Sequence, residues 1–277
     1  MDVRVAPNQN STKTLTTEQL RNEFLVESVF VPGKITMLYS DVDRAIIGGA
    51  MPIDSPVELL ASKKEMSADY FCERREVGIL NIGGSGSITV DGKIYQMELK
   101  DVLYIGKGVN KVTFTSHKKE TPSLFYFISY PAHTAYPTAH AKFSQAEPQK
   151  LGSEKDSNKR TIYKYIHPNG IKSCKLVMGM TELDEGSIWN TMPSHTHLRR
   201  TEVYMYFNLK PDAIVFHMMG EPNETRHLVI RNQQAVISPS WSIHSGAGTS
   251  NYSFCWAMGG ENQEFADMDV IPMNGLF

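Results

Sequence analysis

Short extended runs of β-branched and aromatic residues, separated by turn residues, recur along most of this chain of 277 residues. The strongest hairpin signal is Asp91-Gly92, which lies between the runs 87–90 and 93–97. The other extended runs cover residues 34–40, 45–48, 77–82, 99–106, 111–115, 161–166, 174–180, 188–191, 201–209, 213–219, 226–231, 235–238 and 252–258. Each half therefore has about six or more short strands, which predicts an all-β fold of two β-barrels in tandem.

Helix signals are few. Thr16 and Gln19 have the spacing of a capping box, which predicts a short helix after them. A second helix is predicted from Ser55 to near Lys64, because a capping hydroxyl is followed by Pro56 at the first helical position. We therefore expect only short helices beside the two barrels.

The border between the two halves is predicted from composition. Residues 146–160 are charged, contain Gly, Pro and Ser, and have no aromatic side chain, which is typical of a linker. We therefore expect one domain over residues 1–150 and another over residues 151–277. The glycine-rich stretch 83–86 opens a strand and lacks the G-x-G-x-x-G spacing, so it is interpreted as a turn or bulge.

Charge and cysteine content narrow the function classes. The formal net charge is −2, which does not favour binding to nucleic acid or to an anionic membrane. The cysteines Cys72, Cys174 and Cys255 are odd in number and lack C-x-x-C spacing, which indicates a reducing compartment rather than a disulfide framework. The first residues do not resemble a signal peptide, and no apolar run approaches the about 20 residues that span a bilayer. We expect a cytoplasmic protein with no membrane partner.

The stretch from residue 191 to residue 207 carries the clearest chemical pattern. His195 and His197 are two residues apart, so on a strand both imidazoles point to the same face. Glu202 is an odd number of residues further on, so the chain must turn or bulge between 198 and 201 to return its carboxylate to that face. Two imidazoles and a carboxylate form a partial site for a divalent transition metal.

A fourth ligand can be sought among the later histidines. His217 lies inside an apolar run and is interpreted as a buried wall residue, whereas His227 follows Arg226 at the start of a strand. His244 follows a turn led by Pro239 and precedes small residues that leave room for other groups. We therefore expect His244 to complete the set.

With these four positions the sequence resembles the metal motif of the cupin superfamily, three histidines and one glutamate on neighbouring strands of a β-barrel. Residues 21–27, 81–86, 104–108, 189–197, 216–220 and 237–246 also resemble the family of 5-keto-4-deoxyuronate isomerases, and this likeness runs along most of the chain. The chain departs from the cupin pattern at Leu209 and Trp241, where glycine is usual. The resemblance implies a bicupin, that is, two cupin-type β-barrels in one chain.

The resemblance further implies the activity and the cofactor. The expected enzyme is an aldose–ketose isomerase, an intramolecular oxidoreductase, that interconverts 5-dehydro-4-deoxy-D-glucuronate and 3-deoxy-D-glycero-2,5-hexodiulosonate in pectin and uronate breakdown. One zinc ion per chain, which would stabilise an enediol, falls on His195, His197, Glu202 and His244. The N-terminal half has only His117, His133 and His140 and is expected to be a metal-free barrel. The family also implies a homo-oligomer, by analogy a hexamer.

The residues that handle the substrate are less constrained. A carboxylate substrate favours arginine, and Arg199, Arg200 and Arg226 are the candidates, although such residues on turns are often only solvated. The proton-transferring base stays unassigned, with candidates that share strand parity with Glu202 or lie nearby: Tyr204, Tyr206, Glu182, Asp184 and His227. Trp189 and Trp241 flank the two halves of the motif and are predicted to be cavity walls.

Two alternative functions remain open at this stage. The same ligands could hold iron in a cupin dioxygenase, which would consume oxygen, whereas isomerisation is redox-neutral. The barrel could also bind a sugar acid without catalysis, but no helix-turn-helix pattern or basic stretch would couple such binding to DNA. Nitrogen and carboxylate ligands suit zinc, manganese, iron and nickel alike, so the metal itself is not determined by the residues.

Overall fold

Two sets of β-sheets make up the structure, a computed structural model that describes residues 1–277. One compact unit contains Met1–Arg4, Ser28–Ala146 and Tyr165–Met178, and the other contains Val5–Glu27, Glu147–Lys164 and Gly179–Phe277. The predicted border near residue 150 lies close to one crossing of the chain between the units. Residues 5–27 and 165–178 belong to the unit formed mainly by the other half, so no single cut separates the units.

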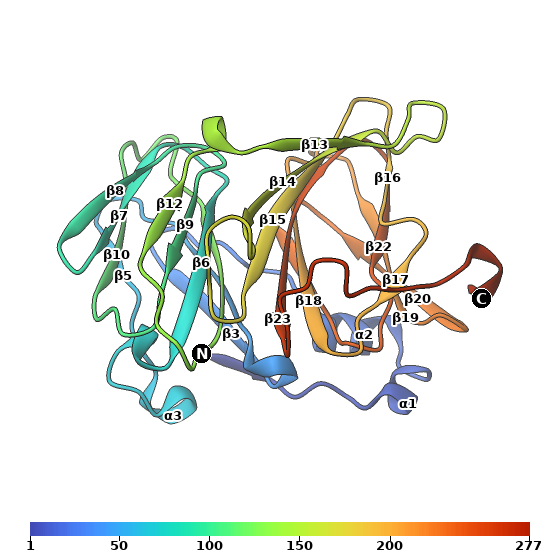
Figure 1. The fold of residues 1–277 in the computed structure, drawn as a ribbon, viewed down its shortest axis with the longest axis horizontal. Coiled ribbons are helices and arrows are strands. Elements are labelled where there is room, and N and C mark those ends of the chain that lie inside the picture. Colours follow the sequence, from blue (N-terminus) through green and yellow to red (C-terminus); the bar gives the residue numbers. More distant parts are fainter. The chain divides into compact units, whose positions relative to one another are not determined.

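The first unit has a seven-stranded sheet beside a four-stranded sheet (Figure 1). The larger sheet has the order β1 (Asp2–Arg4), β3 (Ile35–Ser40), β4 (Ile46–Ala50), β11 (Phe125–Pro131), β6 (Arg75–Asn81), β9 (Val102–Ile105) and β12 (Ala139–Ala141). The smaller sheet has the order β5 (Val57–Glu58), β10 (Val112–Ser116), β7 (Gly86–Val90) and β8 (Lys93–Met97).

The interior of the first unit is apolar. Alternate residues of β6, Val77 and Ile79, point into a core that also contains Phe114, Phe125 and Phe127. All five side chains are fully buried. The aromatic rings of Phe71 and Phe127 meet edge to face in the same core. Burial of this many aromatic and branched side chains is sufficient to hold the two sheets together.

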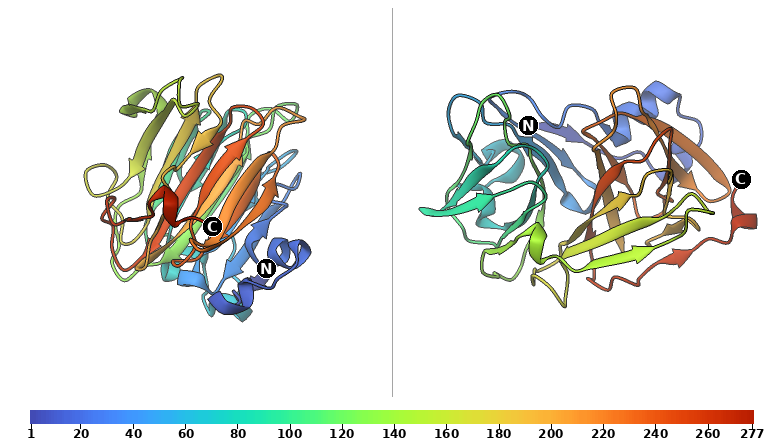
Figure 2. Two further views of the ribbon diagram at one scale, coloured as in Figure 1. Left: turned by 90° about the vertical axis from the view of Figure 1, so that its right-hand side faces the viewer. Right: turned by 90° about the horizontal axis from the view of Figure 1, so that it is seen from above.

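The second unit repeats this arrangement. Its seven-stranded sheet has the order β13 (Pro148–Leu151), β14 (Arg160–Ile166), β15 (Val177–Leu183), β23 (Ser253–Gly260), β18 (Arg200–Phe207), β21 (Gln234–Ser238) and β2 (Leu25–Val26). Its four-stranded sheet has the order β16 (Trp189–Asn190), β22 (Ser245–Gly248), β19 (Val215–Glu221) and β20 (Glu224–Ile230), and a further pair joins β17 (His195–Thr196) to β24 (Asp269–Val270). The left view of Figure 2 shows the orange and red strands of this unit running side by side. The predicted all-β class with tandem barrels is confirmed.

The helices are short, as expected. They are α1 (Gln9–Thr12), α2 (Thr17–Phe24), α3 (Lys63–Met66) and four 3₁₀ turns at Val42–Arg44, Phe71–Glu73, Phe143–Gln145 and Met273–Gly275. The capping box is confirmed at the start of α2, where the Thr16 hydroxyl accepts from the Gln19 amide and the Gln19 side chain accepts from the Thr16 amide. None of these helices has the length and apolar character that a bilayer crossing requires.

The predicted helix from Ser55 to Lys64 is wrong. Val57 and Glu58 instead form an edge strand that pairs with Phe114 and Thr113 of β10. Pairing with a neighbouring strand overrides the local helix signal here, because it satisfies backbone groups that a short isolated helix would leave open. The helix begins later, at α3, where Ser62 is the cap.

The predicted turns at Asp91-Gly92 and at the glycine-rich stretch 83–86 are confirmed. Asp91 and Gly92 both have positive φ values, 46° and 86°, and join β7 to β8 in a two-residue hairpin turn. The glycines at 83 and 84 form a bend between β6 and β7, in which the Gly84 amide donates to the Pro122 carbonyl. The predicted linker contains the short strand β13, which pairs with β14.

Candidate metal centre

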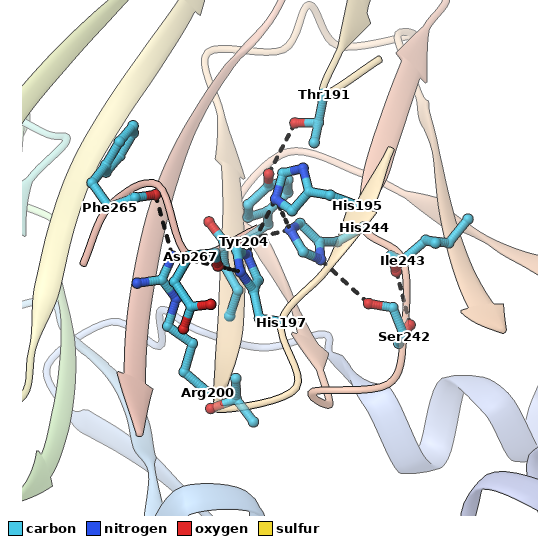
Figure 3. Close-up of polar contacts among 12 residues, drawn as sticks. Thr191, His195, His197, Arg200, Tyr204, Ser242, Ile243, His244, Phe265 and Asp267 are labelled. Carbon is cyan, nitrogen blue, oxygen red and sulfur yellow. Dashed lines mark hydrogen bonds and ion pairs between the residues drawn. The ribbon is translucent and has the colours of Figure 1, made fainter. Parts of the chain in front are cut away.

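Four side chains from three parts of the second unit converge on one point. Figure 3 shows the three histidines of this group facing one another. His195 lies on β17, His197 follows that strand, and Glu202 lies on β18. Residues 198 and 199 form the turn between the two strands, and the Arg200 amide donates to the His197 carbonyl, as the spacing of the motif predicted. His244 lies directly before β22 and follows a turn in which the Ser242 amide donates to the Pro239 carbonyl.

The distances among the four donor atoms fit a shared cation. The Nε2 atom of His195 lies 3.1 Å from that of His197 and 3.0 Å from that of His244. The Oε2 atom of Glu202 lies 2.9 Å from the Nε2 atom of His197 and 2.8 Å from that of His244. Two ligands about 2.1 Å from an ion would be about 3.0 Å apart at right angles and about 3.4 Å apart in a tetrahedron. The observed separations of 2.8–3.1 Å are therefore those of donor atoms that could share one ion.

Contacts outside the cluster orient its rings. The Nδ1 atom of His197 lies 2.7 Å from the backbone carbonyl of Asp267, so this nitrogen donates and Nε2 presents a lone pair to the centre. The Nδ1 atom of His244 faces the Ser242 carbonyl at 3.4 Å. Arg200 is buried and donates to the backbone carbonyls of Glu264, Phe265 and Asp267, which holds the segment that carries the partner of His197.

The protonation state of the cluster suits a metal. Burial, followed by the proximity of His244, lowers the pKa of His195 to about 3, so its imidazole is neutral at pH 7. Burial opposes the ionisation of Glu202, but the nearby side chains of His244 and His197 keep its pKa well below the usual range. Neutral imidazoles and an ionised carboxylate are the forms that coordinate metals. Lone pairs that face one another at about 3 Å are repulsive unless a cation lies between them.

The cluster lies in a cavity of about 290 Å³. His195, His197 and Glu202 are part of its wall, as are Tyr204 and Thr191, whose hydroxyls are 3.0 Å apart. Most of the remaining wall is apolar and consists of aromatic, methionine and branched side chains, among them Phe254, Trp256, Met258, Phe265 and Met268. This size and polarity are typical of a site for one small molecule.

Only one candidate for the catalytic base lines this cavity, Tyr204. Burial, followed by the charge of Glu202, raises the pKa of Tyr204 well above its usual range. Tyr206 lies behind the cavity, where its hydroxyl is 2.7 Å from the Nδ1 atom of the buried His217. Gly246 permits this packing, because a Cβ atom there would lie 3.1 Å from the Tyr206 hydroxyl.

The other base candidates lie elsewhere. The Glu182 carboxylate is 3.4 Å from the Ser253 hydroxyl, and Asp184 forms an ion pair with Lys159. His227 is exposed on β20. None of Glu182, Asp184 and His227 is among the residues that line the cavity.

The structure does not bring the three predicted substrate-binding arginines to the cavity. Arg199 is paired with the carboxylate of Asp267 at the surface, and Arg200 holds the three carbonyls described above. Arg226 donates to carbonyls of residues 12, 13 and 15 and so holds the N-terminal segment against β20. The cation that does line the cavity is Arg160, at the start of β14.

Several residues of the site carried no signal in the sequence. Trp256 and Phe265 line the cavity, whereas the predicted wall residues Trp189 and Trp241 do not. Trp241 packs edge to face on Phe24 of α2 instead. Asp267 is 70 residues from the histidine that it orients, and no local pattern links the two.

The histidines of the first unit are dispersed. His117 is exposed after β10, His133 contacts the thiol of Cys174, and His140 on β12 lies 3.3 Å from the Asp101 carboxylate. Among residues 1–277, the only group of three or more His, Cys, Asp or Glu side chains placed to hold a metal is the one in the second unit.

Solved structures share this architecture. An IolB-like protein from Salmonella typhimurium aligns with a TM-score of 0.72 and 12% identity, over 90% of this chain and 96% of that chain. Lactobacillus farciminis oxalate decarboxylase aligns with a TM-score of 0.61 and 8% identity, over 91% of this chain and 88% of that chain. The fold and the converging ligands thus define the class: a bicupin-like protein with a candidate metal site in one barrel.

The sequence comparisons identify the family. Residues 26–272 match the KduI/IolB family. Proteins named 4-deoxy-L-threo-5-hexosulose-uronate ketol-isomerase from Caldicellulosiruptor bescii and Halalkalibacterium halodurans are each 54% identical over 276 residues, which covers both chains completely. A protein of the same name from Escherichia coli is 54% identical over 277 residues, again over both complete chains. The chain belongs to the KduI/IolB family and is a ketol-isomerase, an intramolecular oxidoreductase.

Proposed function

We propose that this protein is a zinc-dependent isomerase that interconverts 5-dehydro-4-deoxy-D-glucuronate and 3-deoxy-D-glycero-2,5-hexodiulosonate. The observation that carries the proposal is the cluster of His195, His197, Glu202 and His244 in the wall of a cavity sized for one sugar acid. The full-length identity of 54% to proteins named for a uronate ketol-isomerase supports the substrate class.

The reaction moves a proton between two adjacent carbons and exchanges the positions of a carbonyl and a hydroxyl. A metal ion held by His195, His197, Glu202 and His244 would supply a Lewis acid for the negative charge that develops on substrate oxygen. Tyr204 keeps its proton at neutral pH, since its pKa is raised, and its hydroxyl therefore donates a hydrogen bond to a substrate oxygen. A substrate oxygen would accept the hydrogen bond from Tyr204 in place of Thr191, whose own hydroxyl donates to Asn190. Apolar walls such as Phe254 and Trp256 exclude water from the reacting carbons.

Zinc is the metal that we assign, one ion per chain. Three imidazoles and one carboxylate suit zinc, and the outer hydrogen bond from His197 to the Asp267 carbonyl is typical of its histidine ligands. Elemental analysis of protein purified without added metal tests this assignment. A ratio near one zinc per chain supports it, and one equivalent of iron or manganese instead would refute it.

The setting of the enzyme follows from its proposed role in pectin and uronate breakdown. We place it in the cytoplasm, where free thiols such as Cys72, Cys174 and Cys255 persist. We further propose a homo-oligomer, a hexamer. Light scattering coupled to size-exclusion chromatography would give about six times the chain mass of 31.1 kDa if this is correct.

The decisive experiment follows freshly generated 5-dehydro-4-deoxy-D-glucuronate by NMR under argon. Anaerobic conversion to the 2,5-diketo acid, lost with chelator and in a His195→Ala/His197→Ala variant, is the expected result. A folded, metal-loaded protein that leaves the substrate unchanged would exclude this substrate. Turnover that requires oxygen would instead indicate a dioxygenase.

A further inference from the structure

The wall of the cavity is charged at two places. One is the metal-ligand cluster, and the other is Arg160, the only lysine or arginine among the lining residues. Arg160 is the first residue of β14 and is half-buried beside Leu151 and Ile162, which also line the cavity. A guanidinium in such apolar surroundings loses part of its hydration and needs a compensating anion.

No protein carboxylate supplies that anion. The Nη1 atom of Arg160 donates to the Asn158 carbonyl at 2.8 Å, and no ion pair involves this side chain. The adjacent Lys159, in contrast, pairs with Glu154 and Asp184, and Arg199 pairs with Asp267. Arg160 therefore differs from the arginines around it, because it faces a cavity and retains donors that the protein does not use.

The surroundings keep Arg160 charged in the wall of the cavity. Burial lowers the pKa of Arg160, and the hydroxyls of Tyr204 and Tyr252 oppose this shift, so the guanidinium stays protonated at neutral pH. Tyr204 is also in edge-to-face contact with the ring of His244. Arg160, Tyr204 and the metal-ligand candidates His195, His197 and Glu202 line the same cavity, so one small molecule there can contact the guanidinium and the cluster together.

We propose that Arg160 binds the carboxylate of the substrate and so fixes which end of the sugar acid reaches the metal ligands. This inference rests on the proposed function, since it assumes a uronate. The planar guanidinium matches a carboxylate in two parallel hydrogen bonds, which neither a tyrosine nor a lysine can provide. With the carboxylate (C6) at Arg160, the aldehyde end (C1), five carbons away, lies toward His195, His197 and Glu202.

The test compares two variants on two substrates. Arg160→Gln removes the charge and keeps a similar length, and Arg160→Lys keeps the charge without the fork. The substrates are the uronate and its neutral analogue, in which a hydroxymethyl group replaces the carboxylate. Arg160→Gln should lower kcat/KM for the uronate by about 30- to 1,000-fold, mainly through KM, and should leave kcat/KM for the analogue unchanged. The kcat/KM of Arg160→Lys for the uronate should lie between those of Arg160→Gln and the unchanged protein.

Controls separate binding from folding. The matched control is Arg231→Gln, an exposed arginine of the same unit, which should leave kcat/KM for both substrates unchanged. Thermal unfolding and metal content should be the same in all four proteins. Equal losses on the uronate and on the neutral analogue, or no change in KM for the uronate, would overturn the role of Arg160.

A binding measurement tests the carboxylate-binding role of Arg160 separately from the isomerase activity. The alditol acid made by reducing the aldehyde of the uronate cannot isomerise, and its affinity can be measured by calorimetry. Binding that weakens about 30- to 1,000-fold in Arg160→Gln supports the carboxylate site even if the unchanged protein does not isomerise the uronate. Equal affinities for the two proteins, or no binding to either, would refute it.

Discussion

The two units share a strand plan and differ in what their interiors contain. In each, a seven-stranded sheet lies beside a four-stranded one. The fifth strand of the larger sheet is β6 in the first unit, between β11 and β9, and β18 in the second, between β23 and β21. β6 places Val77 and Ile79 in an apolar core, whereas β18 directs Glu202 and Tyr204 to a cavity.

The same arrangement of sheets thus forms in the first unit around an apolar core and in the second around the candidate metal site. Polar groups of that site are therefore not required for this arrangement. The first unit closes around side chains such as Phe114 and Phe127. The second unit adds β17, which carries His195, and β24, which pairs with β17 and covers one side of the cavity through Val270. The site is therefore an addition to a common scaffold, and the four predictions below test this separation.

The largest effect is expected from loss of the metal ligands. The double variant His195→Ala/His197→Ala should lose metal and at least about 10³-fold in kcat/KM, because two of the four donors are gone. Turnover and metal content are the measurements. His117→Ala, an exposed histidine of the first unit, should change neither, and a comparable loss in that control would break the division of roles.

A charge placed inside the apolar barrel should cost about 3–5 kcal/mol of unfolding free energy. Val77 is fully buried, and Val77→Glu would put a carboxylate there without the histidine partners that Glu202 has. Urea unfolding measures the loss. The isosteric Val77→Thr, which buries only a hydroxyl, should cost about 1–3 kcal/mol. A tolerated Val77→Glu would show that this interior is more open than its apolar packing indicates.

Chelation should loosen one barrel and leave the other unchanged. Cys72 in the first unit and Cys255 in the second are both buried, and burial raises the pKa of Cys72 to about 12 and that of Cys255 well above its usual range. Both thiols are therefore alkylated only when their unit opens. Removal of the metal should speed alkylation of Cys255 about tenfold or more, as read by mass spectrometry, with Cys72 as the internal control. Equal acceleration of both would show that the units open together.

The smallest effect is expected at the N-terminal helix. Thr16→Ala removes the cap of α2 and should cost about 1 kcal/mol, whereas Thr17→Ala, one position later and exposed, should cost nothing. Since residues 5–27 belong to the second unit, the faster alkylation should again appear at Cys255. Faster alkylation of Cys72 alone would contradict the assignment of α2 to the second unit.

Local rules were sufficient for the parts of the fold and site that depend on spacing. Strand parity predicted that the chain must turn between His197 and Glu202, and the dipeptide Asp91-Gly92 predicted its hairpin. The four candidate metal donors could be proposed from the sequence because two lie within three residues and His244 follows a turn led by proline, and the structure brings all four together. Each of these signals acts over a few residues.

The remaining features depend on contacts between distant residues. Val57 became a strand because β10, more than 50 residues later, offered backbone partners. Arg160 lines the same cavity as Glu202 and Tyr204 because the strand order of the sheet places β14 near β18. The Asp267 carbonyl, 70 residues from His197, contacts that histidine. The neighbouring Arg199 and Arg200 were natural candidates for a substrate carboxylate, but protein groups already occupy them.

The pairing of β2 with β21 has a consequence for the order of events during synthesis. Leu25 is among the first residues made, yet its partner Val236 is made more than 200 residues later. At about 5–20 residues per second the ribosome needs roughly 10–40 s to cover that interval. During this time the apolar face of α2, with Leu20 and Phe24, lacks the strands that bury it. The barrel with the candidate metal site is therefore completed only late in translation, once β21 has been made.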